Sequence, residues 1–411
     1  MTSSKKSETL QLLQGGQEFF PSLIQAFDSA VSWIQLETYI FDFHGSGTVV
    51  ADALVLAAKR GVTVQVLVDA VGTQPLTDEW QKKFSASGVQ WCVYSPMGSS
   101  LGFLLPERWR RLHRKLCVVD ERIVFCGGIN VLDDFYDPNH GELEAPRFDF
   151  AVVLTGPLAA EVTDAMALLW WRVQAGYSAR QRHLNKAWEK FKASGYGGRT
   201  DAKLLTHPVD TGRYNLAGSS RSKAALVLRD NLRNRYSIER AYRKAIGKAC
   251  QEIIIANAYF LPGGKLRRAL MKAAKRGVHV TLLLQGKYEY FMQYHAARPV
   301  YGALLAAGVE IHEYSTSFLH AKVAVVDGHW ATVGSSNLDP LSLLLAREAN
   351  VVIEDRSFVG ELSACLRKAV AHHGVRIDPA VYSQRPLGRR IQGWIAYAVM
   401  RLALMLTGQR Y

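Results

Sequence analysis

Short apolar runs bounded by turn residues alternate along the chain with longer helical segments. Residues 321–327 read AKVAVVD and, after an Asp-Gly turn signal, residues 330–334 read WATVG, which predicts a strand, a tight turn and a returning strand. Segments 48–60 and 264–276 are predicted to be helices. Alternation of such helices with strands is typical of layered α/β folds, so the sequence predicts that class.

The two halves of the chain repeat one another. Three pairs of similar segments recur in the same order: 36–41 and 255–260, 57–69 and 273–285, 87–95 and 307–315. Each half thus reads strand, helix, strand, strand and then the hairpin. An internal repeat of so long a period indicates two similar domains instead of a solenoid.

Domain boundaries follow from the repeat and from composition. The interval 176–222 is polar, basic and punctuated by glycines, which marks a linker, either a cover for a site or a mobile connection. The sequence predicts a first domain over 1–175, a second domain over 223–375, and a basic and apolar C-terminal tail over 376–411.

Polar side chains converge on one end of the predicted hairpin. His320 and Lys322 stand two positions apart and therefore share a strand face. A hairpin that turns at the Asp-Gly pair folds Ser335 and Asn337 back beside them. Asp327 falls at the turn, where local hydrogen bonds that fix the corner are its expected role. A cation and neutral donors beside an imidazole indicate an anion-binding site with a nucleophile or proton carrier.

A second copy of these groups lies 207 residues upstream (320 minus 113). It comprises His113, Lys115, Asp120, Gly128 and Asn130, at the same offsets from the histidine. The glycine of this copy stands where the later copy has a serine. The two halves are therefore not chemically equivalent, which is compatible with divided roles.

One acid follows each hairpin and precedes an apolar strand: Asp149 in RFDFAVVL and Glu348 in REANVVIE. A carboxylate that accepts a hydrogen bond from an imidazole fixes the tautomer of the ring and stabilises its charged form. We expect that role for both acids. A solvated acid at a strand edge is the alternative.

Two copies of H-x-K-x4-D, each followed by G-[GS]-x-N, resemble the phospholipase D superfamily over nearly the whole chain. The resemblance implies an α/β fold of two similar phospholipase D-like domains, each a mixed sheet flanked by helices, with pseudo-twofold symmetry and one active site at their interface. Displacement at a phosphodiester without metal needs one group to attack and one to protonate, and each half offers one histidine. The motif assigns six residues to catalysis: His113, Lys115, Asp120, His320, Lys322 and Asp327.

The mechanism that the resemblance implies is ping-pong, without metal or cofactor. His113 attacks phosphorus to form a phosphohistidine, and His320 protonates the leaving alcohol and deprotonates the incoming one; the residues alone leave the order of the histidines open. The lysines supply electrostatic stabilisation. A further set binds the phosphate or supports the groups that do: Gly128, Asn130, Asp149, Ser335, Asn337 and Glu348.

Within the superfamily, the chain is most similar to the B-type branch of bacterial cardiolipin synthases. The similarity lies in its size, in a polar N-terminus without membrane helices, and in the segments ANAYFLPG and HWATVGSSNLDPLSLLLAREANVVI. It implies transfer of a phosphatidyl group from one phosphatidylglycerol to the terminal hydroxyl of another, with release of glycerol. The implied setting is the cytoplasmic face of the bacterial inner membrane, as a peripheral protein. The linker and the C-terminal segment match no motif of the branch.

Charge and local pattern favour an anionic phospholipid membrane as the partner. A net charge of +14 and a pI near 9.5 suit any polyanion. An insert ahead of the first catalytic strand joins an apolar tip to a tryptophan and arginines, as interfacial elements do; a loop packed on the protein is the alternative. Segment 389–410 is predicted to be an interfacial helix or a buried one. The predicted membrane contacts are Leu101, Phe103, Leu104, Leu105, Trp109 and Trp394.

Two other functions stay open on the sequence. A nuclease or other phosphodiesterase of the same superfamily fits the basic charge, although the apolar insert argues against nucleic acid, which is usually held on aromatic platforms. A noncatalytic membrane scaffold would keep the fold, but two intact motif copies argue against it. Five scattered cysteines form no metal spacing and suggest reduced thiols in a cytosolic setting.

Overall fold

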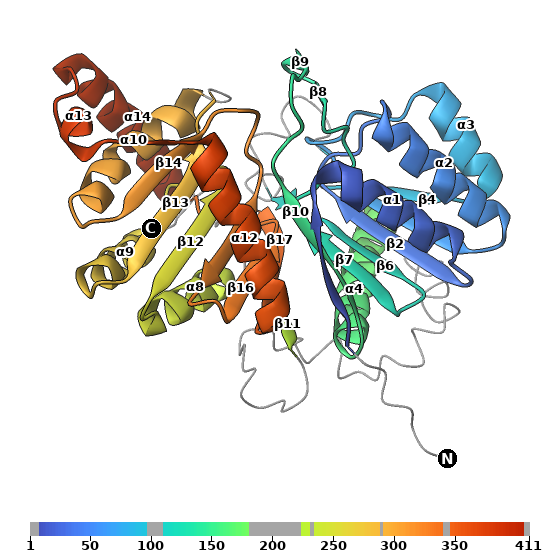
Figure 1. The fold of residues 1–411 in the computed structure, drawn as a ribbon. Helices are drawn as coiled ribbons and strands as arrows, with labels where there is room; N and C mark the ends of the chain where they lie inside the picture. The colour runs from blue at the N-terminus through green and yellow to red at the C-terminus, as the bar shows by residue number, and fades with distance from the viewer. Residues whose placement is uncertain are drawn as a thin grey trace.

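Two mixed β-sheets, one from each half of the chain, pack against each other in the middle of the molecule (Figure 1). The computed structural model describes residues 8–96, 110–180, 223–230, 234–287, 291–339 and 346–406. The first sheet lies on the right of Figure 1 and the second on the left. Strands β7 and β10 of the first sheet contact β16 and β17 of the second, so the antiparallel parts of the two sheets meet at the seam.

The first sheet has seven strands. In spatial order they are β1 (Leu10–Gln14), β10 (Phe150–Thr155), β7 (Ile123–Gly127), β6 (Leu116–Val119), β2 (Trp33–Thr38), β3 (Thr63–Asp69) and β4 (Gln90–Tyr94). Strands β2, β3 and β4 run parallel, and the remaining pairs are antiparallel. A small separate hairpin is formed by β8 (Tyr136–Asp137) and β9 (Gly141–Glu142).

The second sheet repeats this order and has two further strands, β18 at its edge and one strand from the other half. Its strands are β11 (Ala224–Arg229), β17 (Ala346–Ile353), β16 (Trp330–Gly334), β15 (Lys322–Val326), β12 (Glu252–Asn257), β13 (His279–Gln285), β14 (Glu310–Tyr314) and β18 (Gly374–Arg376). Strand β5 (Arg111–Leu112), which belongs to the first half, pairs in parallel with β17. Backbone pairing therefore links the two halves directly beside His113.

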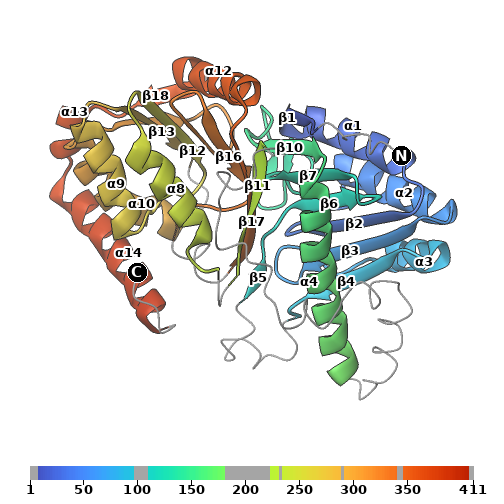
Figure 2. The same ribbon diagram turned by 90° about the horizontal axis from the view of Figure 1, so that it is seen from below.

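Helices cover the outer faces of both sheets and flank the seam (Figure 2). Those of the first half are α1 (Gly15–Asp28), α2 (Ser46–Lys59), α3 (Asp78–Ser87) and α4 (Leu158–Arg180). Those of the second half are α8 (Ser237–Lys248), α9 (Gly264–Lys275), α10 (Phe291–Leu305), α12 (Arg356–His373), α13 (Pro379–Ser383) and α14 (Leu387–Leu406). Helices α4 and α12 hold equivalent places beside the seam, since each contacts its own sheet and one strand of the other.

The repeated segment AAKRGV shows why the two halves fold alike. Its alanines end α2 and α9 on a buried helix face, and its glycine stops each helix. Gly61 and Gly277 have φ angles of 93° and 92°, in the left-handed region that favours glycine after a helix. The apolar residues that follow form β3 and β13, parallel strands buried almost throughout, as their near-continuous apolar runs require.

The predicted fold class is confirmed, and the structure contains the predicted hairpin that follows His320. It consists of β15 and β16, with Val323 opposite Val333, and β6 and β7 form the copy in the first half. Helix α4 continues to Arg180, past the predicted start of the linker, and residues 181–222 lie outside the described part of the chain. The insert with Leu101, Phe103, Leu104, Leu105 and Trp109 also lies outside it.

Candidate active site

The two histidines stand at the same edge of their respective sheets. His113 lies between β5 and β6, and His320 lies two residues before β15. Lys322, the first residue of β15, pairs with Asn257, the last residue of the parallel strand β12. The catalytic hairpins therefore begin where the parallel strands end, the edge at which α/β sheets usually carry their sites.

Each histidine is held by a carboxylate from the opposite half. His113 Nδ1 lies 3.1 Å from Glu348 Oε2, and His320 Nδ1 lies 2.6 Å from Asp149 Oδ2. The backbone repeats the exchange, because the His113 N–H donates to the carbonyl oxygen of Arg347 at 3.0 Å and the His320 N–H to that of Phe148 at 2.9 Å. Neither half thus completes the surroundings of its own histidine.

The carboxylate contacts determine which ring nitrogen is available for chemistry. A carboxylate oxygen at Nδ1 favours the tautomer in which Nδ1 carries the proton, so Nε2 keeps the lone pair. The same carboxylate stabilises the ring when Nε2 gains a proton or a covalent bond. Both histidines are consequently arranged to react through Nε2.

The two motif lysines lie beneath the histidines and are almost fully buried. Lys115 is 5% exposed and Lys322 is 0% exposed. The Lys115 ammonium donates to the carbonyl oxygen of His113 at 2.9 Å, and that of Lys322 donates to the carbonyl oxygen of His320. Burial, and then the charges of Lys322 and Lys115, hold the pKa of His320 well below its usual value. Cations from both halves act on one imidazole, which makes this one site.

Burial also shifts the pKa values of the other ionisable groups in the direction that favours their uncharged forms. It lowers the pKa of Lys115 to about 7 and raises that of Asp149 to about 7. It lowers the pKa of His113 as well, against the opposing effect of Glu348. Desolvated cations gain most from an anion that replaces their lost hydration. The site is therefore suited to a phosphate group, whose charge would favour the protonated lysines.

Gly128 and Ser335 occupy equivalent positions but act differently on the two acids. The Ser335 hydroxyl donates to Glu348 Oε2 at 2.5 Å and accepts from the backbone N–H of Ala349 at 3.0 Å. A side chain at Gly128 would begin 2.2 Å from Asp149 Oδ1, so the space is taken by the shorter acid. This contact gives Ser335 a supporting role at Glu348, and a contact of Ser335 with a phosphate oxygen stays a prediction.

Asn130 and Asn337 are buried beside the hairpins, as their copies of the motif require. The Asn130 side-chain oxygen accepts from the backbone N–H of Ile40 at 3.2 Å, which leaves its amide protons for another acceptor. Asn337 is 2% exposed. Their part in binding a phosphate oxygen stays a prediction.

Asp120 and Asp327 do not reach the histidines, and their assignment to the catalytic group is corrected. Each follows the far end of its strand, five residues beyond the motif lysine and so about 16 Å along an extended chain. Asp120 accepts the backbone N–H groups of Val31, Ser32 and Trp33 at 2.8–2.9 Å. Asp327 accepts those of Cys250, Gln251 and Glu252 at 2.8–2.9 Å. Both carboxylates fix the start of the neighbouring strand, in agreement with the turn chemistry of the hairpin.

Replacing Asp120 with alanine is therefore expected to lower stability and to spare chemistry. Loss of the carboxylate leaves three backbone donors without their acceptor, at a cost of about 1–3 kcal/mol. Thermal unfolding should shift down by a few degrees, while turnover well below the transition stays within about threefold of wild type. A loss of turnover as large as that of a histidine variant, with unchanged melting, would contradict this assignment.

Three groups at the site were missed by sequence reasoning. The Tyr39 ring centroid lies 4.9 Å from that of His113 and 5.4 Å from the Lys115 ammonium. Asp69 Oδ2 accepts the backbone N–H of Leu112 at 2.7 Å, and Gln285 Oε1 accepts that of Leu319 at 3.2 Å. Asp69 and Gln285 end the repeated segments 57–69 and 273–285, so the repeat itself contained their signal.

A buried ion pair supports the first motif copy alone. Arg114, between the catalytic histidine and lysine, lies 3.6 Å from Glu37, and burial raises the pKa of Glu37 to about 7. In the second half the equivalent positions are Ala256 and Ala321. The two halves thus differ in this ion pair as well as at the positions of Gly128 and Ser335.

Trp394 lies on α14, away from the histidines, and 58% of its surface is exposed. Among the described residues, no group of three or more His, Cys, Asp or Glu side chains is arranged to hold a metal ion.

Comparisons with known proteins agree on one family. A family model described as "Cardiolipin synthase, PLD-like domain" matches residues 23–141 and 242–369, one match in each half. Cardiolipin synthase B of Escherichia coli is 34% identical over 417 residues, which cover 99% of this chain and 91% of that protein. Probable cardiolipin synthase YwiE of Bacillus subtilis is 28% identical, with 93% of this chain and 69% of that protein covered.

Solved structures share the fold at low sequence identity. Phosphatidylserine synthase of Haemophilus influenzae superposes with a TM-score of 0.65 at 13% identity, over 97% of this chain and 94% of that one. Polyphosphate kinase of Porphyromonas gingivalis gives a TM-score of 0.51 at 14% identity, over 88% of this chain and 50% of that one. The arrangement of two sheets around one seam is thus common to proteins of different activity.

Proposed function

Because this chain belongs to the cardiolipin synthase family of the phospholipase D superfamily, we propose that it makes cardiolipin from two molecules of phosphatidylglycerol and releases glycerol. The observation that carries the proposal is the reciprocal pairing of each histidine with the acid of the other half, which assembles one two-histidine site. The substrates are lipids of an anionic membrane, and the protein works as a peripheral enzyme on the cytoplasmic face of the bacterial inner membrane.

The reaction proceeds in two displacements at the same phosphorus. His113 Nε2 attacks the donor phosphate, the bond from phosphorus to the headgroup glycerol breaks, and His320 gives a proton to the departing oxygen. A second phosphatidylglycerol then enters, its terminal hydroxyl loses a proton to His320, and the oxygen attacks phosphorus. The phosphorus–nitrogen bond breaks, which frees His113 and leaves cardiolipin.

The surrounding groups stabilise each stage of this exchange. Lys115 and Lys322 hold the nonbridging oxygens of the phosphate, whose negative charge offsets the cost of their burial. Glu348 stabilises His113 while it carries the phosphatidyl group. The close contact between His320 and Asp149 keeps the proton of the acid–base pair at the site, because burial raises the pKa of that carboxyl to about 7.

The pH dependence of kcat/KM follows from these shifts. His113 must be neutral to attack, and its lowered pKa means that protonation removes activity only below the ordinary value of 6.5. Lys115 must be charged, and its pKa of about 7 means that activity declines as the pH rises above neutrality. We expect a bell-shaped profile with its acid limb below pH 6.5, measured on detergent-dispersed lipid. An acid limb above that value would contradict the assignment of the base.

The test of the proposed function uses purified protein and phosphatidylglycerol liposomes in the presence of a chelator. Lipid products and free glycerol are followed by mass spectrometry, with His113→Ala as the control. Cardiolipin and glycerol in equal amounts, formed only with the intact histidine, would support the proposal. Phosphatidic acid in place of cardiolipin would indicate a hydrolase, and absence of lipid turnover would overturn the proposed function.

A further inference from the structure

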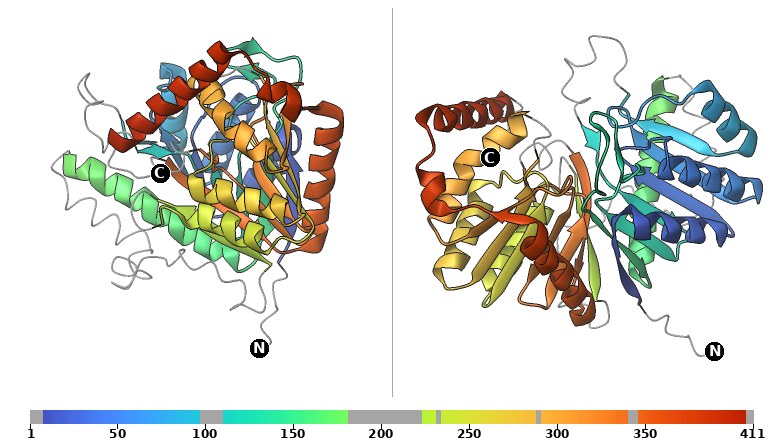
Figure 3. Two further views of the ribbon diagram at one scale, coloured as in Figure 1. Left: turned by 90° about the vertical axis from the view of Figure 1, so that its left-hand side faces the viewer. Right: turned by 45° about the horizontal axis from the view of Figure 1, so that its top comes forward.

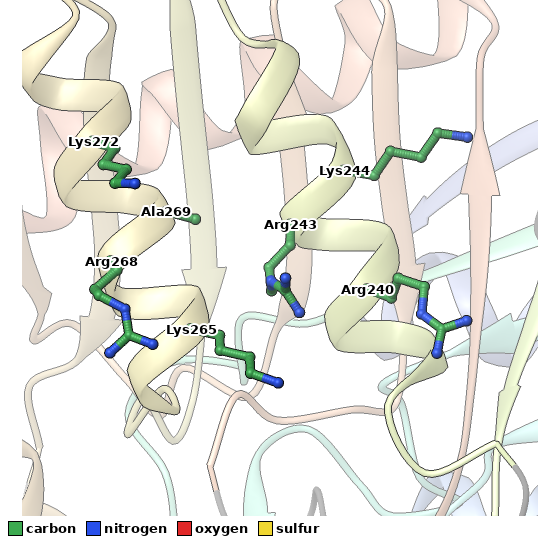
Figure 4. Close-up of a pocket in the computed structure, with 7 residues that line it drawn as sticks. All are labelled: Arg240, Arg243, Lys244, Lys265, Arg268, Ala269 and Lys272. Carbon is green, nitrogen blue, oxygen red and sulfur yellow. The ribbon is translucent and has the colours of Figure 1, made fainter.

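A groove lined by cations runs between α8 and α9, which belong to the helices of the second half (Figure 4). It encloses about 510 Å³ and is lined, apart from Ala269, by basic residues alone: Arg240, Arg243, Lys244, Lys265, Arg268 and Lys272. Figure 4 shows Arg243 and Lys265 directed into the space between the helices. Glu239, a buried acid, lies 3.8 Å from Arg243. Such a concentration of positive charge favours a polyanionic partner.

The fold does not require these charges, as the first half of the chain shows. There α1 and α2 pack on each other in the same place as α8 and α9. Helix α1 has no lysine or arginine, and α2 has only Lys59. Equivalent helices without a basic groove thus build the same layer. The cations of α8 and α9 are a property of the second half alone.

The position of the cations on α9 works against the helix itself. Lys265 and Arg268 lie within the first five residues of α9, and the first turn of this helix contains no acidic residue. The N-terminus of a helix carries a partial positive charge, so basic residues there are locally unfavourable and an anion there is favourable. Helix α9 follows β12, and its N-terminus therefore lies towards the sheet edge that holds Lys322.

Helix α14 adds an apolar surface to the same side of the molecule. One of its faces packs on α10, where Ala396 is buried among residues such as Val300 and Leu304. The opposite face carries large apolar side chains at helical spacing, with exposed fractions from 49% to 70%: Leu387, Ile391, Trp394, Ile395, Val399 and Leu402. Within the described part of the chain, no helix is long and apolar enough to cross a membrane. A helix with one packed and one exposed apolar face is suited to lie in a membrane interface.

The groove and the apolar face belong to one layer of helices. Helix α8 contacts α9, α9 contacts α10, and α10 contacts α14, and the four helices cover the outer face of the second sheet (Figures 2 and 3). We refer to these four helices as the helix layer. Cations beside exposed apolar residues and a tryptophan match the headgroup and acyl regions of a bilayer. A nucleic acid would use the cations but would gain nothing from the apolar face.

We propose that the helix layer is the surface with which this protein docks on a bilayer containing anionic phospholipid. The groove of α8 and α9 binds lipid phosphates, and the exposed face of α14 enters the boundary between headgroups and acyl chains. The inference rests on the proposed lipid substrate, and it adds which surface of the protein contacts the membrane. Docking on this side would bring the sheet edge with the catalytic hairpin of the second half close to the lipid surface.

The test is cosedimentation of the full-length protein with vesicles of phosphatidylethanolamine and phosphatidylglycerol, and with vesicles of phosphatidylcholine as the neutral reference. The groove variant is Lys265→Gln with Arg268→Gln and Lys272→Gln. Its control removes three exposed cations of the first half: Lys59→Gln, Lys82→Gln and Arg122→Gln. We expect the groove variant to bind anionic vesicles at least about tenfold more weakly than wild type, and the control to change less than about threefold. Equal losses would show that net charge alone acts, which would overturn the proposal.

The apolar face is tested by Ile391→Gln with Ile395→Gln, which should weaken vesicle binding at high salt, where the electrostatic part is screened. Cardiolipin formation from detergent-dispersed phosphatidylglycerol should be unchanged in both sets of variants, because none of these residues touches the histidines. If wild type binds vesicles but makes no cardiolipin in detergent, the proposed function fails and the docking surface stands. If the groove variant loses binding to a single-stranded oligonucleotide and keeps its binding to vesicles, the docking proposal is wrong.

Discussion

Replacing either His113 or His320 with alanine is expected to reduce cardiolipin formation by about 10⁴-fold or more, the range found when a reacting histidine is removed. The acid of the other half holds Nδ1 of each imidazole, which leaves Nε2 to react. Neither histidine substitutes for the other, because one must carry the phosphatidyl group while the other moves a proton. Product formation by mass spectrometry and vesicle binding by cosedimentation measure the two properties separately.

The two variants should retain fold and lipid binding. Both side chains lie at the rim of the sheets, and neither belongs to the apolar core. Melting temperatures close to wild type would show that the loss is chemical. A residual rate only tenfold below wild type in either variant would mean that one histidine suffices, which would contradict the two-histidine mechanism.

The exchange of acids between the halves predicts which histidine each acid serves. Asp149→Asn removes the charge beside His320, and Glu348→Gln removes the charge beside His113. Each change is expected to lower turnover by about 10²- to 10⁴-fold, since a neutral amide neither fixes the tautomer nor stabilises the charged ring. Steady-state turnover with the two histidine variants alongside measures the size of both effects.

A substrate with a good leaving group separates the two acids. A nitrophenyl ester of phosphatidic acid needs little protonation of its leaving group, so the first step depends on the nucleophile and hardly on the acid. Asp149→Asn should then keep most of the rapid release of nitrophenol, whereas Glu348→Gln should lose it. The opposite pattern would exchange the roles of His113 and His320, and equal losses would contradict the assignment of one acid to each role.

The sequence was sufficient for the fold class, because strands and helices leave local patterns. The candidate reacting groups also come from a local pattern, and their roles stay a prediction. Strand and helix periodicity, the AAKRGV repeat and the spacing of His320 and Lys322 all act within a few residues of the chain. The pairing of His113 with Glu348 joins residues 235 positions apart and depends on how two sheets meet. No periodicity within either half encodes that contact.

The motif groups two aspartates with the histidines although the structure places them at the far edge of the sheets. Asp120 and Asp327 belong to the pattern by spacing, yet a strand of this length takes them to the far edge of the sheet. Hydrogen bonding at the turn, where their φ angles of 51° and 49° are tolerated by aspartate, accounts for their presence. Ser335 lies at the predicted end of the hairpin, and its hydroxyl donates a hydrogen bond to Glu348, the acid that contacts His113. The spacing of the motif predicts which residues lie on the hairpin. The hydrogen bonds in the structure are needed to tell residues that can react from residues that hold the backbone or another side chain in place.

The most direct test of a single site with a covalent intermediate is to trap that intermediate in the His320→Ala variant. The variant is mixed with the nitrophenyl ester, quenched rapidly, digested and mapped by mass spectrometry. The account predicts a burst of about one nitrophenol per protein and a phosphatidyl group on the peptide that contains His113. A phosphatidyl group on any other residue, or product formation without a burst or an adduct, would contradict it.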